Sequence, residues 1–196
     1  MKRSRDKSRA ISKIPFFLAL LACLLGVYLT QQRGSGIPPV SSSSTATFEV
    51  GFSPKGKSLN IILDGIKKAE DSILVAAYSF TSRPISTALL EAHKRGVAVQ
   101  VVADAKSNSG QYSAVTFLAN QGVPVRVNDR YAIFHHKFMV IDSRHVETGS
   151  FNYSAAAVDR NAENVLMLSN VPEVAQVYSR EWLRLWNEAK EVKPSY

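Results

Sequence analysis

The sequence predicts an α/β domain in which a mixed β-sheet is covered by helices on both faces. Two observations predict this fold class. Segments with helical apolar spacing alternate with short runs that are apolar at nearly every position, and Gly, Pro and Ser residues separate them. Continuous apolar runs are typical of strands that are buried on both sides. With 196 residues, 45% of them hydrophobic, the chain is long enough for one domain with an ordinary core.

The first 30 residues form a segment of a different kind. A basic stretch, residues 2–13, precedes the apolar run of residues 14–29. This layout is typical of a secretory signal or a membrane anchor. Positive charges beside such a segment stay in the cytoplasm, so the sequence predicts that the rest of the chain is exported. We expect a periplasmic domain that is either released by signal cleavage or tethered to the inner membrane by residues 14–29.

Charge and cysteine content say little about the partners of the domain. The formal net charge is +8, but residues 1–33 hold seven of the 24 Lys and Arg residues and one of the 16 acidic residues. Most of the positive charge therefore belongs to the N-terminal segment. Cys23 is the only cysteine and lies in the apolar run, so we expect a domain without a disulfide.

Residues 31–46 are rich in Gly, Pro and Ser and predict a linker. The domain then covers residues 47–196. The predicted order of its elements is a helix around 59–66, a strand at 72–80, a helix from 82 to 96, a strand at 97–105, a short helix at 113–121, strands at 123–129, 137–142, 145–149 and 164–168, and a final helix.

Several residues predict where these helices begin and end. Ser82 and Pro84 suit the start of the second helix, and Gly96 suits a left-handed C-terminal cap. Asn170 and Glu173 form an N-x-x-E pattern, which is typical of a capped helix start. The last helix then carries an apolar face with both tryptophans.

One segment carries the residues on which a functional prediction depends. It reads HHKFMVIDSRHVETGSFN and follows the pattern H-x-K-x4-D-x6-G-S-x-N, with His135, Lys137, Asp142, Ser150 and Asn152 as its polar members. Residues two apart in a strand share a face, so His135 and Lys137 stand side by side. A turn at Asp142 returns the chain, and the next strand brings Ser150 and Asn152 back beside the start of the first.

These groups suit attack on a phosphodiester. Imidazole is a nucleophile near neutral pH and also serves as an acid or a base. Lys137, Ser150 and Asn152 can donate to the phosphate oxygens, whose charge changes in the transition state. Because the lysine and the amide supply the positive field, we predict no metal site and no cofactor.

The pattern resembles the signature of the phospholipase D superfamily. Residues 50–54, 77–81 and 94–97 and the Trp-containing C-terminal helix also resemble the small, single-motif exported endonucleases of that superfamily from plasmid-bearing bacteria. The likeness covers roughly residues 48–196. It implies the phospholipase D/nuclease fold and phosphodiesterase activity.

The resemblance also implies a role for each residue of the motif. His135 attacks phosphorus and forms a phosphohistidine intermediate. Lys137 and Asn152 bind the phosphate oxygens, with Ser150 in support. Asp142 belongs to the catalytic motif, where it fixes the geometry of the hairpin and influences the site indirectly.

Two further expectations come from the same resemblance. Glu163, 11 residues after Asn152, belongs to the substrate-binding group and orients an imidazole. A second imidazole must protonate the leaving oxygen, and the chain has only one H-x-K sequence. Short chains of the family solve this as homodimers in which each subunit contributes one motif to a shared site.

Some of these residues also have ordinary explanations. A histidine near a strand start is often structural, a lysine at a sheet edge is often a solvated residue, and Asp142 suits the turn on conformational grounds alone. Lys106, Arg126, Arg130 and Tyr131 either follow a phosphate backbone or form a solvated rim, and the sequence leaves both open.

Three functions compete. The short single-motif chain and its export favour a non-specific endonuclease acting on DNA, with RNA as a further substrate. A membrane anchor near lipid favours a phospholipase D that acts on phospholipid head groups. The third is a non-enzymatic, membrane-tethered nucleic-acid-binding module. The complete motif argues against it, because a protein that only binds does not need His135, Lys137 and Asn152 together.

Overall fold

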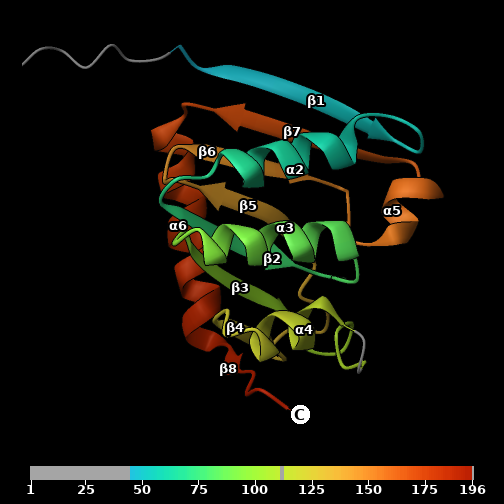
Figure 1. Cartoon of the computed structure of the whole chain (residues 1–196), viewed down its shortest axis with the longest axis vertical. Helices are drawn as coiled ribbons and strands as arrows, with labels where there is room; N and C mark the ends of the chain where they lie inside the picture. The colour runs from blue at the N-terminus through green and yellow to red at the C-terminus, as the bar shows by residue number, and fades with distance from the viewer. Residues whose placement is uncertain (1–44, 111–112, 196) are drawn as a thin grey trace, which may run out of the picture. The chain divides into compact units, whose positions relative to one another are not determined.

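The computed structural model describes residues 45–110 and 113–195 (Figure 1). Its centre is one eight-stranded sheet with the strand order β1-β7-β6-β5-β2-β3-β4-β8. Along the chain the elements are β1 (Thr47–Ser53), α2 (Ser58–Lys68), β2 (Ser72–Ala77), α3 (Arg83–Lys94), β3 (Ala98–Asp104), α4 (Ala114–Asn120), β4 (Val125–Asn128), β5 (Lys137–Ile141), β6 (His145–Gly149), α5 (Ala155–Asp159), β7 (Glu163–Ser169), α6 (Pro172–Glu188) and β8 (Lys190–Glu191).

The sheet is mixed because its two halves are connected in different ways. β2, β3 and β4 run parallel to one another, with helices α3 and α4 in the connections. The other pairs, including β2 with β5 and β5 with β6, are antiparallel. Parallel strands need such helical crossovers, whereas a short turn joins β5 to β6.

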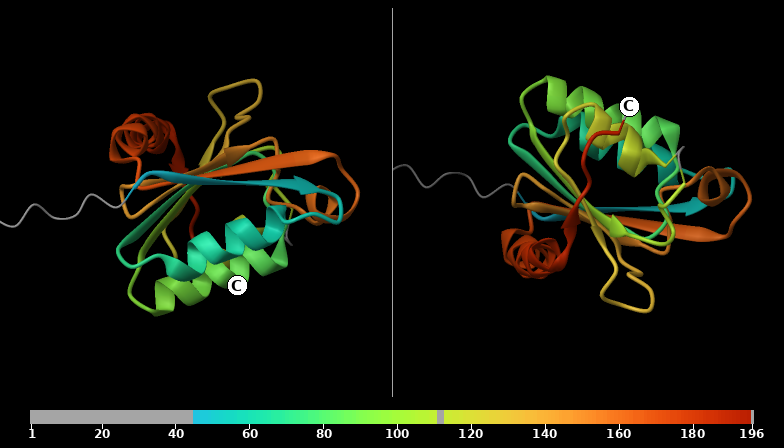
Figure 2. Two further views of the ribbon diagram at one scale, coloured as in Figure 1. Left: turned by 90° about the horizontal axis from the view of Figure 1, so that it is seen from above. Right: turned by 90° about the horizontal axis from the view of Figure 1, so that it is seen from below.

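Helices lie on both sides of the sheet. Figure 2 shows α2 and α3 on one side and α6 on the other. The larger core packs beneath α2, α3 and α4 and includes Ile62, Leu89 and Leu118. A smaller core, with Val140 and Trp182, lies between the sheet and α6. The predicted α/β fold class, a mixed sheet flanked by helices on both faces, is confirmed.

Several local features explain how the helices are placed. Gly65 lets α2 approach the sheet closely, since a Cβ atom there would lie 2.6 Å from Met167 Cε. The Trp182 indole N–H donates to the Val75 carbonyl (2.9 Å), which fixes α6 to the middle of the sheet. Gly96 follows α3 with a φ of 97°, as its predicted left-handed cap requires.

The start of α6 differs from the prediction. Asn170 has a φ of 56°, a left-handed conformation, and is not the N-cap of the helix. Val171 occupies that position, and Pro172 begins the helix, where its missing N–H costs no hydrogen bond. The N-cap therefore lies one residue later than the N-x-x-E pattern predicted, because the proline determines where the helix begins.

The N-terminal expectations lie largely outside the described residues. The signal or anchor segment and nearly all of the linker fall within residues 1–44. Within the part of the chain that the structure describes, no helix is long and apolar enough to cross a bilayer.

Candidate active site

Most of the predicted site residues lie along one edge of the sheet, the edge formed by the ends of its strands. β5 begins at Lys137, and its antiparallel partner β6 ends at Gly149. β7 begins at Glu163, which pairs with Ser53 at the end of β1. Antiparallel pairing therefore brings the residues before β5, the residues after β6 and the first residue of β7 to the same edge.

Lys137 and His135 are held together at this edge. The Lys137 ammonium donates to the His135 carbonyl oxygen (2.9 Å), and its side chain is largely buried. Burial lowers the pKa of Lys137, while the nearby Glu163 carboxylate acts in the opposite direction. The His135 residue is exposed. A phosphate at this position would restore the solvation of the ammonium that burial removes.

Tyr78 supports both of these residues and was missed as a site residue. Its ring centroid lies 4.6 Å from that of His135 and 5.2 Å from the Lys137 ammonium nitrogen. Tyr78 directly follows β2, and Ala77, the last residue of β2, pairs with Lys137. The strand register, which the sequence does not reveal, places this aromatic ring against the imidazole and the ammonium.

Ser150 and Glu163 form a second pair across the edge. The Ser150 hydroxyl donates to Glu163 Oε2 (2.6 Å) and accepts from the Asn164 backbone N–H (3.1 Å). Asn161 donates to the other carboxylate oxygen of Glu163 (3.0 Å). Within residues 45–110 and 113–195 no histidine lies within ion-pair distance of Glu163. Glu163 therefore makes no such contact with a histidine among the described residues, and its expected role in orienting an imidazole stays a prediction.

Asn152 completes the group. It is half-buried, and its Oδ1 atom has no hydrogen-bond partner among the described residues. The next residue, Tyr153, fixes this segment because its carbonyl oxygen accepts the N–H groups of Thr81 (2.9 Å) and Ser82 (2.8 Å). The Asn152 amide is therefore held in place by its backbone and not by bonds of its own oxygen.

Asp142 does not lie with these groups. It follows the last residue of β5, five positions from Lys137, or about 16 Å along a strand. Its carboxylate accepts the backbone N–H groups of Glu70, Asp71 (2.8 Å) and Ser72 (3.0 Å). Burial alone would raise the pKa of Asp142, but these hydrogen bonds lower it. These contacts tie the β5–β6 turn to the start of β2, which agrees with the expected role of Asp142 in fixing the hairpin and places it away from the groups that could touch a substrate.

A buried acid and a buried phenol lie beside the site, and the sequence gives no sign of them. Glu147 in β6 is 1% exposed, and the Tyr153 hydroxyl donates to its carboxylate (2.6 Å). Burial raises the pKa of Glu147 to about 8. Because Tyr153 directly follows Asn152, this bond fixes the segment that carries the amide.

The three basic residues near the motif and Tyr131 differ in their surroundings. The Arg126 guanidinium lies over the Trp186 ring (4.4 Å) and donates to the Trp186 carbonyl (2.9 Å), so it is part of the packing. Lys106 and Arg130 are exposed. The Tyr131 hydroxyl bonds to Glu188 (2.7 Å).

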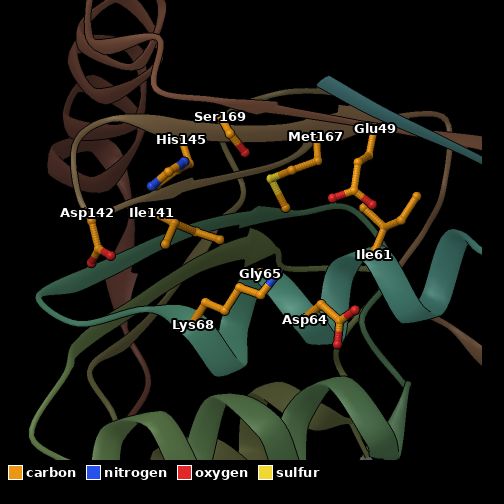
Figure 3. A pocket seen from close by; sticks show the side chains of 10 residues that line it. All are labelled: Glu49, Ile61, Asp64, Gly65, Lys68, Ile141, Asp142, His145, Met167 and Ser169. Atoms are coloured by element: carbon orange, nitrogen blue, oxygen red, sulfur yellow. The ribbon is translucent and has the colours of Figure 1, made fainter. Parts of the chain in front are cut away.

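Two hollows differ in their chemistry. An open groove beside α6 contains His135, Lys137 and Tyr178. A different pocket lies between α2 and the sheet (Figure 3). It is lined by Glu49, Ile61, Asp64, Gly65, Lys68, Ile141, Asp142, His145, Met167 and Ser169. It contains none of the clustered site residues. The groove beside α6 contains His135 and Lys137, so the candidate active site is the cluster of residues at the start of β5 and the end of β6, next to this groove.

Comparisons with known proteins identify the family of the chain. A family model described as the PLD-like domain of cardiolipin synthase matches residues 62–186. A phospholipase D of Rickettsia conorii is 33% identical over 93% of this chain and 97% of its own length. A mitochondrial cardiolipin hydrolase of Danio rerio is 29% identical over 94% of this chain and 77% of its own.

The crystal structure of Nuc from Salmonella typhimurium, a phospholipase D family member, superposes with a TM-score of 0.74. Its sequence identity is 38%, and the match covers 76% of this chain and 99% of Nuc. The matched family model spans the β5–β6 hairpin and Glu163. The chain therefore belongs to the phospholipase D superfamily and is one of its phosphodiesterases.

Proposed function

We propose that this chain is a nuclease that hydrolyses nucleic acid without a metal ion, through a covalent intermediate on His135. The observation that carries the proposal is the meeting of an exposed imidazole, a largely buried ammonium and a carboxamide at one sheet edge. These are a nucleophile and two donors for phosphate oxygens.

The cations of the same edge support a polyanionic substrate. Exposed basic side chains occur in the loops that follow β1, β3, β4 and α5: Lys55, Lys57, Lys106, Arg130 and Arg160. Phosphate groups of a nucleic acid bind such a rim through their charge.

The reaction has two steps. His135 attacks phosphorus, a P–N bond forms, and the bond to the leaving oxygen breaks while a second imidazole donates a proton to that oxygen. Water then attacks the phosphohistidine, the second imidazole takes its proton, and the P–N bond breaks. Lys137 and Asn152 donate to the non-bridging oxygens in both steps.

The second imidazole is proposed to come from His135 of a second copy of the chain. Phe48 and Phe52 of β1 are 72% and 65% exposed, and Val50 between them is 46% exposed. The alternate residue Gly51 faces α2, so these three side chains lie on the α6 side of the sheet. α6 itself exposes Val177 and Leu183.

This apolar surface supports a two-fold dimer. Among the described residues, α6 is the only helix on its side of the sheet (Figure 2), and none of them covers the edge strand β1 there. A two-fold axis beside the groove would place the α6 of each subunit over the exposed strands of the other. It would also bring two copies of His135 and Glu163 together, so that the carboxylate orients the partner's imidazole.

Subunit mixing tests the shared site. We expect dimers of a His135→Asn subunit with a wild-type subunit to be inactive, because each lacks one of the two imidazoles. After unfolding and refolding together in equal amounts, activity should fall to about one quarter of that of the wild type. Independent sites would leave about one half, and an active monomer in light scattering would also rule out the shared site.

A phospholipase D is the second candidate, because the Rickettsia relatives carry that name. Both candidate functions use the same chemistry, so only an assay of the substrates can distinguish them. Plasmid DNA, RNA and labelled phosphatidylcholine and cardiolipin vesicles should be tested side by side in excess EDTA. We expect cleavage of nucleic acid to persist, because Lys137 supplies the positive charge that a metal would otherwise provide.

The outcomes of this assay are distinct. Release of lipid head groups without cleavage of nucleic acid would replace the nuclease assignment with a phospholipase. Activity that EDTA abolishes and magnesium restores would contradict the metal-independent mechanism.

A further inference from the structure

The loop between β4 and β5, residues 129–136, is a rigid projection beside the groove. Figure 2 shows it standing out from the sheet on the same side as α6. The Arg130 N–H donates to the Asn128 side chain (3.0 Å) at one end. The Phe134 N–H donates to the buried Asp104 carboxylate (2.9 Å) at the other, and the Phe134 ring is 1% exposed.

Tyr131 is fixed by α6. Its hydroxyl donates to Glu188 (2.7 Å) and accepts from Arg184 (2.6 Å), and Arg184 also bonds to Glu181. The tyrosine remains 38% exposed although its polar atom is fully engaged. The Arg184 guanidinium carbon lies over the ring, 5.9 Å from its centroid, so what the tyrosine leaves to solvent is mainly the rest of its apolar ring surface, held in one position.

Ile133 adds a second apolar group to the same projection. It is 55% exposed and belongs to neither core cluster, in contrast to its neighbour Phe134. Ile133 lies two positions before His135, so their Cα atoms are within about 7 Å. An exposed isoleucine held this close to a nucleophile is available to the part of the substrate next to the scissile phosphate.

We propose that Tyr131 and Ile133 form a platform that binds the nucleobase next to the scissile phosphate of a single-stranded nucleic acid. This inference rests on the proposed nuclease function. The side chains that donate hydrogen bonds to phosphate oxygens bind every phosphodiester alike. A rigid apolar surface, in contrast, favours a substrate with flat, unstacked bases. Stacking of a base on a protein aromatic ring contributes about 1–3 kcal/mol by alanine substitution and is insensitive to sequence.

The test uses two single-stranded oligonucleotides of equal length, one with ordinary bases and one with abasic nucleotides, which have the same phosphates. Tyr131→Ala and Ile133→Ala should lower kcat/KM on the ordinary oligonucleotide by about tenfold, mainly through KM. Neither should change kcat/KM on the abasic one. Tyr131→Phe, which keeps the ring, should retain most of the activity. Phe117→Ala, which removes an exposed ring from α4, is the matched control and should affect neither substrate.

An equal loss on both oligonucleotides, or a change of oligomeric state in light scattering, would overturn the proposal, since the loop would then act on the fold or on the dimer. Unchanged cleavage of the ordinary oligonucleotide would also overturn it. Loss of activity confined to phospholipid vesicles would assign the platform to lipid instead. Failure of the wild type to cut any oligonucleotide would refute the nuclease function itself, which is a separate result.

Discussion

His135→Asn should lower turnover by at least about 10³-fold while the fold and the binding of substrate persist. Asparagine has a similar size but no nitrogen that can attack phosphorus. His135 is exposed and makes its ring contact with Tyr78 at the surface, so the core packing does not depend on it. Single-turnover cleavage of a labelled oligonucleotide measures the loss, and circular dichroism checks the fold.

His93→Asn is the matched control for this substitution. His93 lies in the last turn of α3, on the far side of the sheet from α6 and its groove. We expect wild-type turnover from it. A His135→Asn enzyme with comparable activity would refute the assignment of the nucleophile.

Glu147→Gln should change the pH dependence of stability more than any other single substitution in the domain. In the folded protein burial raises the pKa of Glu147 to about 8, from an ordinary value of 4.5. The folded state therefore keeps a proton that the unfolded state releases above pH 4.5. The contribution of Glu147 to stability is complete below pH 4.5 and is lost as the pH rises toward 8, by up to about 1.4 kcal/mol per pH unit.

Glutamine is neutral throughout this range and can keep a hydrogen bond to Tyr153. The free energy of unfolding of the wild type should thus fall relative to that of the variant as the pH rises, by roughly 3–4 kcal/mol between pH 5 and pH 8. Urea unfolding of both proteins at pH 5, 6, 7 and 8 measures this difference. The other groups with shifted pKa values, including His136 and His145, contribute equally to both proteins and cancel in this difference. Parallel pH profiles would show that Glu147 ionises normally in the fold.

Much of the fold is predictable from apolar spacing, because buried strands and amphipathic helices leave distinct patterns. β1, α5 and β8 are the elements that sequence analysis did not identify. In β1 the apolar residues Phe48, Val50 and Phe52 alternate with polar residues or glycine, but the apolar side chains are the exposed ones, so this short pattern does not mark a face that the core buries. α5 has five residues and β8 has two, which is too short for a periodic pattern.

The site residues were predictable to the extent that they are local in sequence. His135 and Lys137 share a strand start, and one turn brings Ser150 back to them. The contributions of Tyr78 and Tyr153 depend on which strands pair and in which register, and these are long-range properties. Asp142 is the converse case: it belongs to the motif in sequence, but the length of β5 separates it from the clustered site residues.

Trapping the intermediate tests the central claim most directly. The protein should be mixed with a single-stranded oligonucleotide in excess EDTA and quenched in alkali, where phosphohistidine persists, and its peptides should be mapped by mass spectrometry. The proposed mechanism predicts a nucleotidyl adduct on His135 that is absent from His135→Asn and is lost on brief treatment with acid. Cleavage of the oligonucleotide without any adduct on His135, or an adduct on another residue, would contradict it.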